Sequence, residues 1–295
     1  MALDLKERLA DKLRGWVAPP LARGRRSAQV LAVASSKGGV GKTTTAVNLA
    51  VAFANAGLHV LLLDLDPQSH VACALGLPPD ANRALLADVL KGTLREVMEV
   101  AQASAWPRLT VAGSDENLAE TEMVLSAKIG KELLLNAALA TTRSHYDLIV
   151  IDCPPNMGTL TLNALCAADS LLVPADMSVL ALKGVGDLLS CVDTLRMRLN
   201  RPVEVCGIVP TRLDRRLKEA NAAVSEGLKE RFGDKLLRTA IPQTSAINRA
   251  HIAGRPIFDF APQSVGATAY KALAEELVPL LRLSPQARAA LAEPS

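Results

Sequence analysis

The chain has 295 residues, of which 49% are hydrophobic, 21% are charged and only 3% are aromatic. That length fits one α/β domain or two small ones, and with so few aromatics the core must be built from Ala, Leu and Val. The formal net charge of +3 is only mildly basic, so the clustering of the charges matters more than their sum. No apolar run approaches the ~18 residues of a membrane span, and the N-terminus lacks the apolar core of a secretory signal, so we expect a cytoplasmic protein.

Residues 1–27 form a basic extension ahead of the first predicted strand. Leucines, Trp16 and Val17 are spaced loosely for one helix face, with lysines and arginines between them. A basic amphipathic helix of this kind could lie on a membrane or in a partner's groove. It could equally pack on its own domain, and the sequence leaves both readings open.

A glycine loop follows. Over residues 37–44 the chain reads Lys-Gly-Gly-Val-Gly-Lys-Thr-Thr, after an apolar run at 30–34 and before a helix-forming stretch at 45–56. Strand, glycine loop and helix are the context that a phosphate-binding loop requires. The glycines let the backbone curl so that successive N–H groups point at phosphate oxygens, and the helix start adds partial positive charge.

The last residues of the loop have chemistry suited to a nucleotide. Lys42 is placed to reach the β- and γ-phosphates, Thr43 to give its hydroxyl to Mg²⁺, and Thr44 to hydrogen-bond an inner phosphate. The loop departs from the ordinary pattern at its start, where Ser36 replaces the first glycine and Lys37 adds a second lysine.

Two later apolar runs end in carboxylates. The run at 59–63 leads into Asp64 and Asp66, which Pro67 follows, and the run at 148–151 ends at Asp152. Carboxylates at the C-terminal edge of a parallel sheet face the crevice where ligands bind. Asp152 would hold Mg²⁺ together with Thr43, whereas Asp64 and Asp66 could also merely cap the next helix. Lysines, a metal and one water-orienting carboxylate suffice for phosphoryl transfer, which needs no covalent nucleophile.

Seven apolar segments are predicted to be strands, and helical patterns lie between most of them. The segments are Val30–Ala34, His59–Asp64, Leu109–Ala112, Leu148–Ile151, Ser170–Pro174, Val203–Val209 and Leu236–Ile241. This alternation predicts an α/β fold, doubly wound, with a mostly parallel sheet and helices on both faces.

These motifs together resemble the ParA/MinD family of deviant Walker A ATPases, which are P-loop NTPases. The likeness rests on the loop with two lysines, on the Asp-x-Asp-Pro-Gln segment at 64–68 and on the segment after Asp152, and it covers about 250 residues. It implies a ParA-like ATPase domain over 28–283, flanked by the extension 1–27 and a tail at 284–295. It also implies that Lys37 reaches the nucleotide of a second subunit, and that Asp66 orients the attacking water.

The resemblance assigns a complete set of site residues. Catalytic roles fall to Lys37, Lys42 and Asp66. The metal is assigned to Thr43, Asp64 and Asp152. Nucleotide contacts are assigned to Lys37, Gly38, Gly39, Val40, Gly41, Lys42, Thr43 and Thr44, with Thr211, Ile241 and Pro242 around the adenine.

DNA contacts are expected from a basic cluster behind the strand at 203–209. The cluster consists of Arg212, Arg215, Arg216 and Lys218, with Arg249 as a later contributor. Without a reading helix or interleaved aromatics, such a surface should bind DNA regardless of sequence. A merely solvated helix face is the alternative, and the chain has Gln243 and Ala246 where partition relatives usually carry arginines.

The five cysteines are scattered without a C-x-x-C pair, so they read as reduced thiols rather than as cluster ligands of iron–sulfur relatives. The resemblance then implies an ATPase of slow intrinsic turnover that uses ATP and Mg²⁺ to form a sandwich homodimer on double-stranded DNA. A ParB-like or other partner would stimulate hydrolysis, and the cycle would position a plasmid, a chromosome or a protein assembly on the nucleoid. Two alternatives remain: a MinD-like membrane switch acting through residues 1–27, and a metabolic ATP-dependent synthetase.

Overall fold

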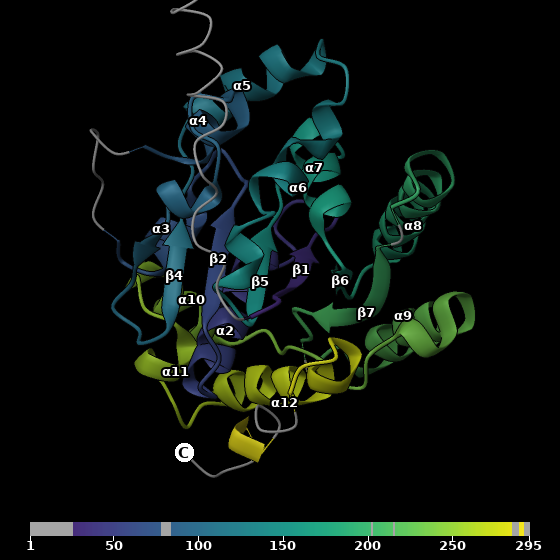
Figure 1. Cartoon of the computed structure of the whole chain (residues 1–295). Helices are drawn as coiled ribbons and strands as arrows, with labels where there is room; N and C mark the ends of the chain where they lie inside the picture. The colour runs from purple at the N-terminus through teal and green to yellow at the C-terminus, as the bar shows by residue number, and fades with distance from the viewer. Residues whose placement is uncertain (1–25, 78–83, 202, 215, 285–288, 292–295) are drawn as a thin grey trace, which may run out of the picture.

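A computed structural model describes residues 26–284 except 78–83, 202 and 215, and also residues 289–291. The described chain forms a seven-stranded sheet in the order β3-β4-β2-β5-β1-β6-β7, with helices on both faces (Figure 1). All neighbouring strands are parallel except β3, which runs antiparallel to β4 at one edge. The α/β, doubly wound and mostly parallel fold predicted from the sequence is confirmed.

The strands are β1 (Gln29–Val33), β2 (Val60–Asp64), β3 (Gln102–Ala103), β4 (Leu109–Ala112), β5 (Leu148–Asp152), β6 (Ser170–Asp176) and β7 (Glu204–Thr211). The helices are α2 (Lys42–Asn55), α3 (His70–Ala74), α4 (Leu86–Lys91), α5 (Asn117–Ser126), α6 (Leu134–Ala138), α7 (Thr159–Ala167), α8 (Val179–Leu199), α9 (Lys218–Phe232), α10 (Ser245–Ile252), α11 (Ile257–Phe260) and α12 (Val265–Leu280). Short 3₁₀ turns lie at Val97–Glu99, Lys131–Leu133, Thr142–Ser144 and Gly233–Lys235.

Two hydrophobic layers hold the helices to the sheet. Alternate residues of β1 belong to different layers, with Val30 and Ala32 on one side and Leu31 and Val33 on the other. Helices α4 to α8 cover the first side, and α2, α3 and α10 to α12 cover the second (Figure 1). The strands are therefore buried on both faces, which explains why they read as continuous apolar runs.

Helix α2 carries the glycine loop at its N-terminus and ends where the sequence predicts. Gly57 has a φ of 92°, its N–H donates to Ala54 O at 2.9 Å, and the N–H of Leu58 donates to Phe53 O at 3.1 Å. This pair of bonds is a Schellman motif, and it requires a left-handed residue that glycine provides without strain.

Six of the seven predicted strands are confirmed with end shifts of at most two residues, and the seventh is wrong. The segment 236–241 forms only two backbone hydrogen bonds with β7, from Leu237 N to Ile208 O at 2.9 Å and from Ile241 N to Pro210 O at 2.8 Å. Between these points the N–H groups of residues 238 and 239 donate to the Glu276 carboxylate of α12 instead of to a strand ladder. Strand β3, a two-residue edge strand, was not expected.

No helix in the described residues is long and apolar enough to cross a membrane. Residues 1–25 and most of 284–295 lie outside the described residues, so the extension, the tail and the domain boundaries predicted there stay predictions.

Candidate nucleotide site

The C-terminal edges of the central strands bring the predicted loop and carboxylates together. Strands β2, β5 and β1 are neighbours, and their register pairs Asp152 with Asp64 on one side and with Val33 on the other. The loop leaves β1 directly after Val33, so both aspartates lie beside it. The strand order thus assembles segments that are far apart in the sequence.

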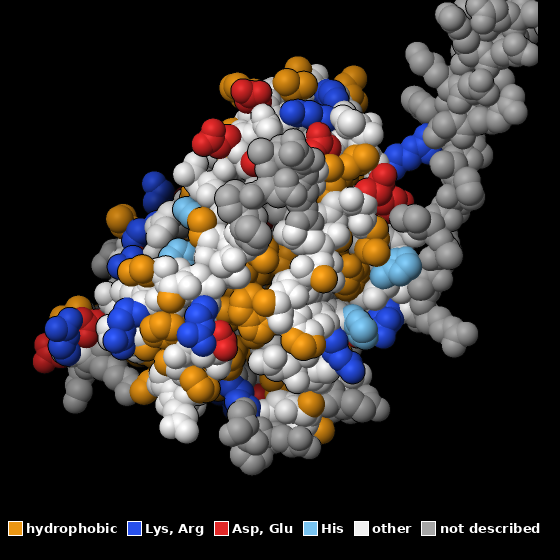
Figure 2. Space-filling model, turned by 90° about the vertical axis from the view of Figure 1, so that its left-hand side faces the viewer, with side chains coloured by type: hydrophobic (Ala, Val, Ile, Leu, Met, Phe, Trp, Pro, Cys, Tyr) orange, Lys and Arg blue, Asp and Glu red, His pale blue; other side chains and the backbone are white. Residues whose placement is uncertain are grey.

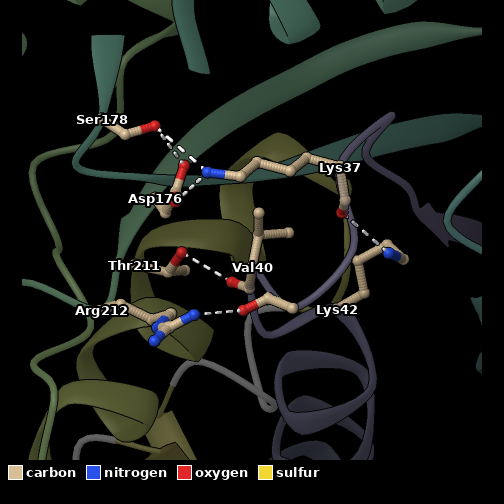
Figure 3. A network of polar contacts seen from close by, with 8 residues as sticks. Lys37, Val40, Lys42, Asp176, Ser178, Thr211 and Arg212 are labelled. Atoms are coloured by element: carbon tan, nitrogen blue, oxygen red, sulfur yellow. Dashed lines mark hydrogen bonds and ion pairs between the residues drawn. The ribbon is translucent and has the colours of Figure 1, made fainter. Parts of the chain in front are cut away.

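The loop itself is wound as a phosphate-binding loop should be. Gly39 and Gly41 have φ values of 73° and 91°, a region where only glycine is unstrained. Lys42 is 6% exposed and its Nζ donates to Lys37 O at 3.2 Å (Figure 3). Burial lowers the pKa of Lys42, while the negative charges of Asp152 and Asp66 act to raise it. A cation held among carboxylates at the start of a helix suits a phosphate ligand.

The second lysine points elsewhere. The Lys37 side chain is 39% exposed, and its Nζ lies 2.5 Å from Asp176 Oδ2 and 3.3 Å from Ser178 Oγ (Figure 3). Ser178 in turn donates to Asp176 Oδ1 at 3.0 Å, so the lysine ends in a small polar cluster between β6 and α8. The two lysines of one loop therefore have separate partners, one inside the loop and one at its rim.

The two strand-end aspartates differ in their partners. Both are fully buried, but Asp64 accepts hydrogen bonds from the N–H groups of Asp66 and Val71, at 3.0 and 3.1 Å. Burial raises the pKa of Asp64 to about 7, against the lowering effect of those bonds. Burial and the neighbouring Asp64 charge also raise the pKa of Asp152 well above its ordinary value. Asp64 therefore already holds the loop that follows it.

The surroundings of Asp152 fit a hard divalent cation. Neither of its carboxylate oxygens receives a hydrogen bond of ordinary geometry, although the Thr43 hydroxyl lies close enough to lower its pKa. Unpartnered buried carboxylate oxygens beside a hydroxyl are suitable donors for Mg²⁺. In the described residues no three His, Cys, Asp or Glu side chains are arranged to hold a metal by themselves. Mg²⁺ usually takes one or two carboxylates plus substrate phosphates, and this donor set is compatible with that habit.

Asp66 sits on a loop held in place by two serines. Ser114 Oγ donates to Asp66 O at 2.6 Å, and Ser69 Oγ donates to Ser114 O at 2.8 Å. The Asp66 side chain accepts from Gln68 N at 3.0 Å and is 6% exposed. The Asp66 loop is therefore fixed against the end of β4 before any ligand binds.

A cavity of about 280 Å³ opens beside the loop and contains the residues predicted to surround the adenine. Its lining includes Thr211, Ile241 and Pro242, together with Gly39, Val40, Gly41 and Thr44 of the loop and Arg212, Gln243, Thr244, Ile247, Asn248 and Tyr270. The structure thus brings the phosphate loop and the predicted base pocket into one space.

The described members of the predicted DNA cluster differ in their surroundings. Arg216 is 88% exposed and pairs with Asp214 at 2.6 Å, whereas Arg249 is exposed on α10. Arg212 lies at the nucleotide cavity, where its Nη1 donates to Gly39 O at 2.9 Å. Arg215 is outside the described residues, as is the side chain of Lys218 at the start of α9. Figure 2 shows the face at the left of Figure 1, away from α8 and α9, where Lys and Arg side chains are scattered among other types.

Sequence reasoning missed Asp176, Ser178 and Ser114. Asp176 could have been found, because it ends β6 as Asp64 and Asp152 end their own strands. The two serines carry no sequence signal, since a serine at a loop is common and its hydrogen bonds depend on the tertiary fold.

The sequence is similar to a family model and to proteins of known function. A family model for an AAA domain, AAA_31, matches residues 28–205. The sporulation initiation inhibitor protein Soj of Bacillus subtilis is 36% identical over 249 residues, which are 84% of this chain and 98% of Soj. The chromosome partitioning protein ParA of Caulobacter vibrioides (strain NA1000 / CB15N) is 37% identical over 252 residues, which are 85% of this chain and 94% of that protein.

Among solved structures, cobyrinic acid a,c-diamide synthase from Mycobacterium smegmatis with bound ADP and magnesium is similar, with a TM-score of 0.75 and 32% identity. The match covers 86% of this chain and 96% of that one. The likeness therefore extends over nearly the whole described fold.

Proposed function

The chain belongs to the ParA/MinD family of P-loop ATPases, and from this premise we propose that it is an ATP-driven dimerising switch that positions a cargo on DNA. It binds ATP with Mg²⁺, forms a homodimer in which nucleotide lies between the subunits, and binds double-stranded DNA in that state. Hydrolysis to ADP and phosphate, stimulated by a ParB-like or other partner, returns it to the free form in the cytoplasm. The proposal is supported by relatives named as partition and sporulation proteins and by the site described above.

Each residue of the site has a physical task in this cycle. The loop N–H groups and Lys42 neutralise phosphate charge, and Asp66 orients the water that attacks the terminal phosphate. Asp152 and Thr43 would hold Mg²⁺, which supplies charge neutralisation on the phosphate oxygens when bound. Ser114 and Ser69 keep Asp66 in position, so little reorganisation accompanies the reaction.

The exposure of Lys37 is the observation that supports dimerisation in this proposal. Lys42 is buried within its own loop, whereas the Lys37 side chain is 39% exposed and ends at the rim of the site. Once it leaves its ion pair with Asp176, this partly exposed lysine can contact the phosphates of a nucleotide on another subunit. One loop thereby serves two nucleotides.

DNA binding in the proposal comes from the exposed arginines outside the cavity. Arg216 and Arg249 are both exposed, at the turn before α9 and on α10, and neither lines the nucleotide cavity. Each phosphate that they neutralise adds roughly 0.9 to the slope of log affinity against log salt, without any sequence preference.

The experiment compares the mass in solution of Asp66→Ala and Lys37→Ala proteins with ATP, by size-exclusion chromatography with light scattering. Asp66→Ala should form a stable dimer with ATP and a monomer with ADP, and Lys37→Ala should stay monomeric in both. A salt series with plain duplex DNA then follows, in which Arg216→Ala should lower the slope. An Asp66→Ala protein that stays monomeric with ATP would overturn the proposal.

A second candidate is favoured by the named function of the Mycobacterium smegmatis structure, a diamide synthase. An ATP-dependent synthetase would hydrolyse ATP only when its carboxylate substrate and nitrogen donor are present, and DNA would have no effect. ATP turnover with and without duplex DNA therefore separates the two candidates. A membrane switch through residues 1–27 is the third reading, and liposome pelleting with and without that segment tests it.

A further inference from the structure

Arg212 is the one described member of the predicted DNA cluster that contacts the nucleotide site. It follows the last residue of β7, and its guanidinium reaches the phosphate loop, where Nη1 donates to Gly39 O at 2.9 Å (Figure 3). Its neighbour Thr211, 2% exposed, donates from Oγ1 to Val40 O at 2.7 Å. Two successive residues at the end of one strand thus hold two successive carbonyls of the loop.

The hydrogen bonds set the direction of the peptide units that they hold. Every described peptide bond is trans, so the N–H of each unit points away from its carbonyl. With the Gly39 and Val40 carbonyls directed at β7, the N–H groups of Val40 and Gly41 point away from it. In Figure 3 Lys42 lies on that opposite side of the loop. The strand end therefore orients loop donors toward the side on which the phosphate-binding lysine lies.

The backbone of Arg212 also indicates a special role. Its φ is 54°, in the left-handed region that costs a residue with a Cβ atom free energy. The turn places the arginine side chain over the loop instead of along the continuing strand direction. Strain of this kind persists where the surroundings require it, and the contact with the loop is such a requirement.

We propose that Arg212 is a positioning residue of the nucleotide site that presets the phosphate loop together with Thr211, and that it is not a DNA contact. The inference rests on the proposed nucleotide binding but not on DNA binding or dimerisation. The guanidinium has five N–H donors and the loop carbonyl uses one of them, so the others can meet nucleotide phosphate or ribose oxygens in the same cavity.

The chain offers a matched control in Arg108. This residue also has a left-handed backbone, with a φ of 64°, and its guanidinium also donates to a glycine carbonyl, that of Gly57. Gly57 lies just beyond the C-terminal end of α2, whereas the phosphate loop lies at its N-terminal end. Arg108→Ala therefore reproduces the chemical change at a place remote from the nucleotide.

The test measures ADP affinity by calorimetry on the nucleotide-free full chain, because ADP binding requires neither a dimer nor DNA. Arg212→Ala should weaken ADP binding about tenfold, as expected for one charge-assisted hydrogen bond, and Arg108→Ala should leave it unchanged. Arg212→Lys should keep part of the wild-type ADP affinity, since one donor can still reach the Gly39 carbonyl. Added methylguanidinium should partly restore the ADP affinity of Arg212→Ala. A general loss of stability would give neither form of rescue.

A second measurement separates nucleotide from DNA. At saturating ATP, Arg212→Ala should keep the wild-type slope of DNA affinity against salt. Unchanged ADP affinity would overturn the inference, and a slope reduced by about one unit would overturn its statement that Arg212 is not a DNA contact. Either result would leave the proposed switch standing. If the wild-type chain bound no ADP at all, the proposed function would fail as well.

Discussion

The two sides of the phosphate loop are built differently. On the β2 and β5 side, Asp152 is fully buried and its oxygens have no hydrogen-bond partner of ordinary geometry. On the β6 and β7 side, Asp176, Thr211 and Arg212 each bond to the loop itself. The first side is incomplete without a cation, because an unpartnered buried carboxylate costs free energy. The second side already has its hydrogen-bond partners, and its task is to hold the loop in shape beside the nucleotide cavity.

Asp66→Ala tests the β2 and β5 side through the rate of ATP hydrolysis, and of the variants considered it should change its measured quantity most. Removing the group that orients the attacking water should lower ATP turnover at least about 100-fold, while ATP affinity stays close to wild type. Phosphate release under saturating ATP and partner-free conditions measures it. Glu116→Ala, which removes an exposed carboxylate directly before α5, is the control and should hydrolyse ATP normally. Full turnover in Asp66→Ala would remove this residue from the mechanism.

Lys42→Ala should act on binding instead of turnover. Lys42 is buried in the loop, and losing a charged hydrogen bond to phosphate should weaken ADP binding by roughly 10- to 150-fold. Calorimetry with ADP measures the change, and Lys91→Ala, an exposed lysine at the end of α4, serves as control. Equal losses in the two variants would show that the loop does not bind phosphate through this lysine.

The buried carboxylates should also make the nucleotide-free protein sensitive to pH. The folded pKa of Asp64 is about 7, against an ordinary value of 3.8, so between these values the folded state binds more protons than the unfolded state. The contribution of Asp64 to the free energy of unfolding should then be highest at low pH and fall as pH rises toward 7, by at most about 1.4 kcal/mol per pH unit for each proton. Urea unfolding between pH 4.5 and pH 8, at pH values spaced by about half a unit, measures the slope.

Two additions sharpen that measurement. Asp64→Asn should flatten the dependence, because the asparagine side chain does not titrate in this range. Saturating Mg²⁺ and ATP should reverse the loss near pH 7, since a bound cation favours the ionised carboxylates. A slope that is the same in Asp64→Asn and wild type would mean that other groups cause it.

The residues on the two sides of the phosphate loop also differ in how well the sequence predicts them. Asp64 and Asp152 end apolar strands, and the loop has its own glycine and lysine pattern, so local residues indicate both the fold and the ligand side of the site. The sequence groups Arg212 with its basic neighbours, and nothing local shows that a left-handed turn aims its side chain at the loop. Contacts such as Ser114 with Asp66 join segments 48 residues apart and depend on the sheet order.

The segment 236–241 has the apolar pattern of a strand, and no local signal shows that Glu276 of α12 accepts two of its N–H groups. Glu276→Gln tests whether this carboxylate stabilises the irregular segment. The carboxylate is 14% exposed and accepts from the N–H groups of Arg238 and Thr239, each at 2.9 Å. Burial alone would raise the pKa of Glu276, but these bonds and the Thr239 hydroxyl lower it overall. Its stabilisation is therefore present above the ordinary pKa of 4.5 and is lost as pH falls below it.

Glu276→Gln should cost about 1 kcal/mol of unfolding free energy at pH 7, because one oxygen acceptor replaces two. The difference from wild type should shrink toward pH 3.5, as the wild-type carboxyl begins to take up a proton. Chemical denaturation at both pH values measures it. Arg238→Ala keeps the backbone N–H and removes a side chain that is 93% exposed, so it should change little. A Gln variant as stable as wild type at pH 7 would leave the irregular segment unexplained.

Asp176→Asn should have the smallest effect on stability and the most specific effect on function. Its ion pair with Lys37 is partly exposed, so the change should alter the free energy of unfolding by no more than about 1 kcal/mol. The same pair holds Lys37 within its own subunit, and the proposed dimer needs that lysine on the partner's nucleotide. Weakening the pair should therefore lower the ATP concentration for half-maximal dimerisation a few-fold, as measured by light scattering in the Asp66→Ala background. Ser178→Ala leaves the ion pair in place and should dimerise as the parent does. If Asp176→Asn dimerised less readily than its parent, Asp176 would instead direct Lys37 toward the second subunit, and the β6 side would belong to the interface.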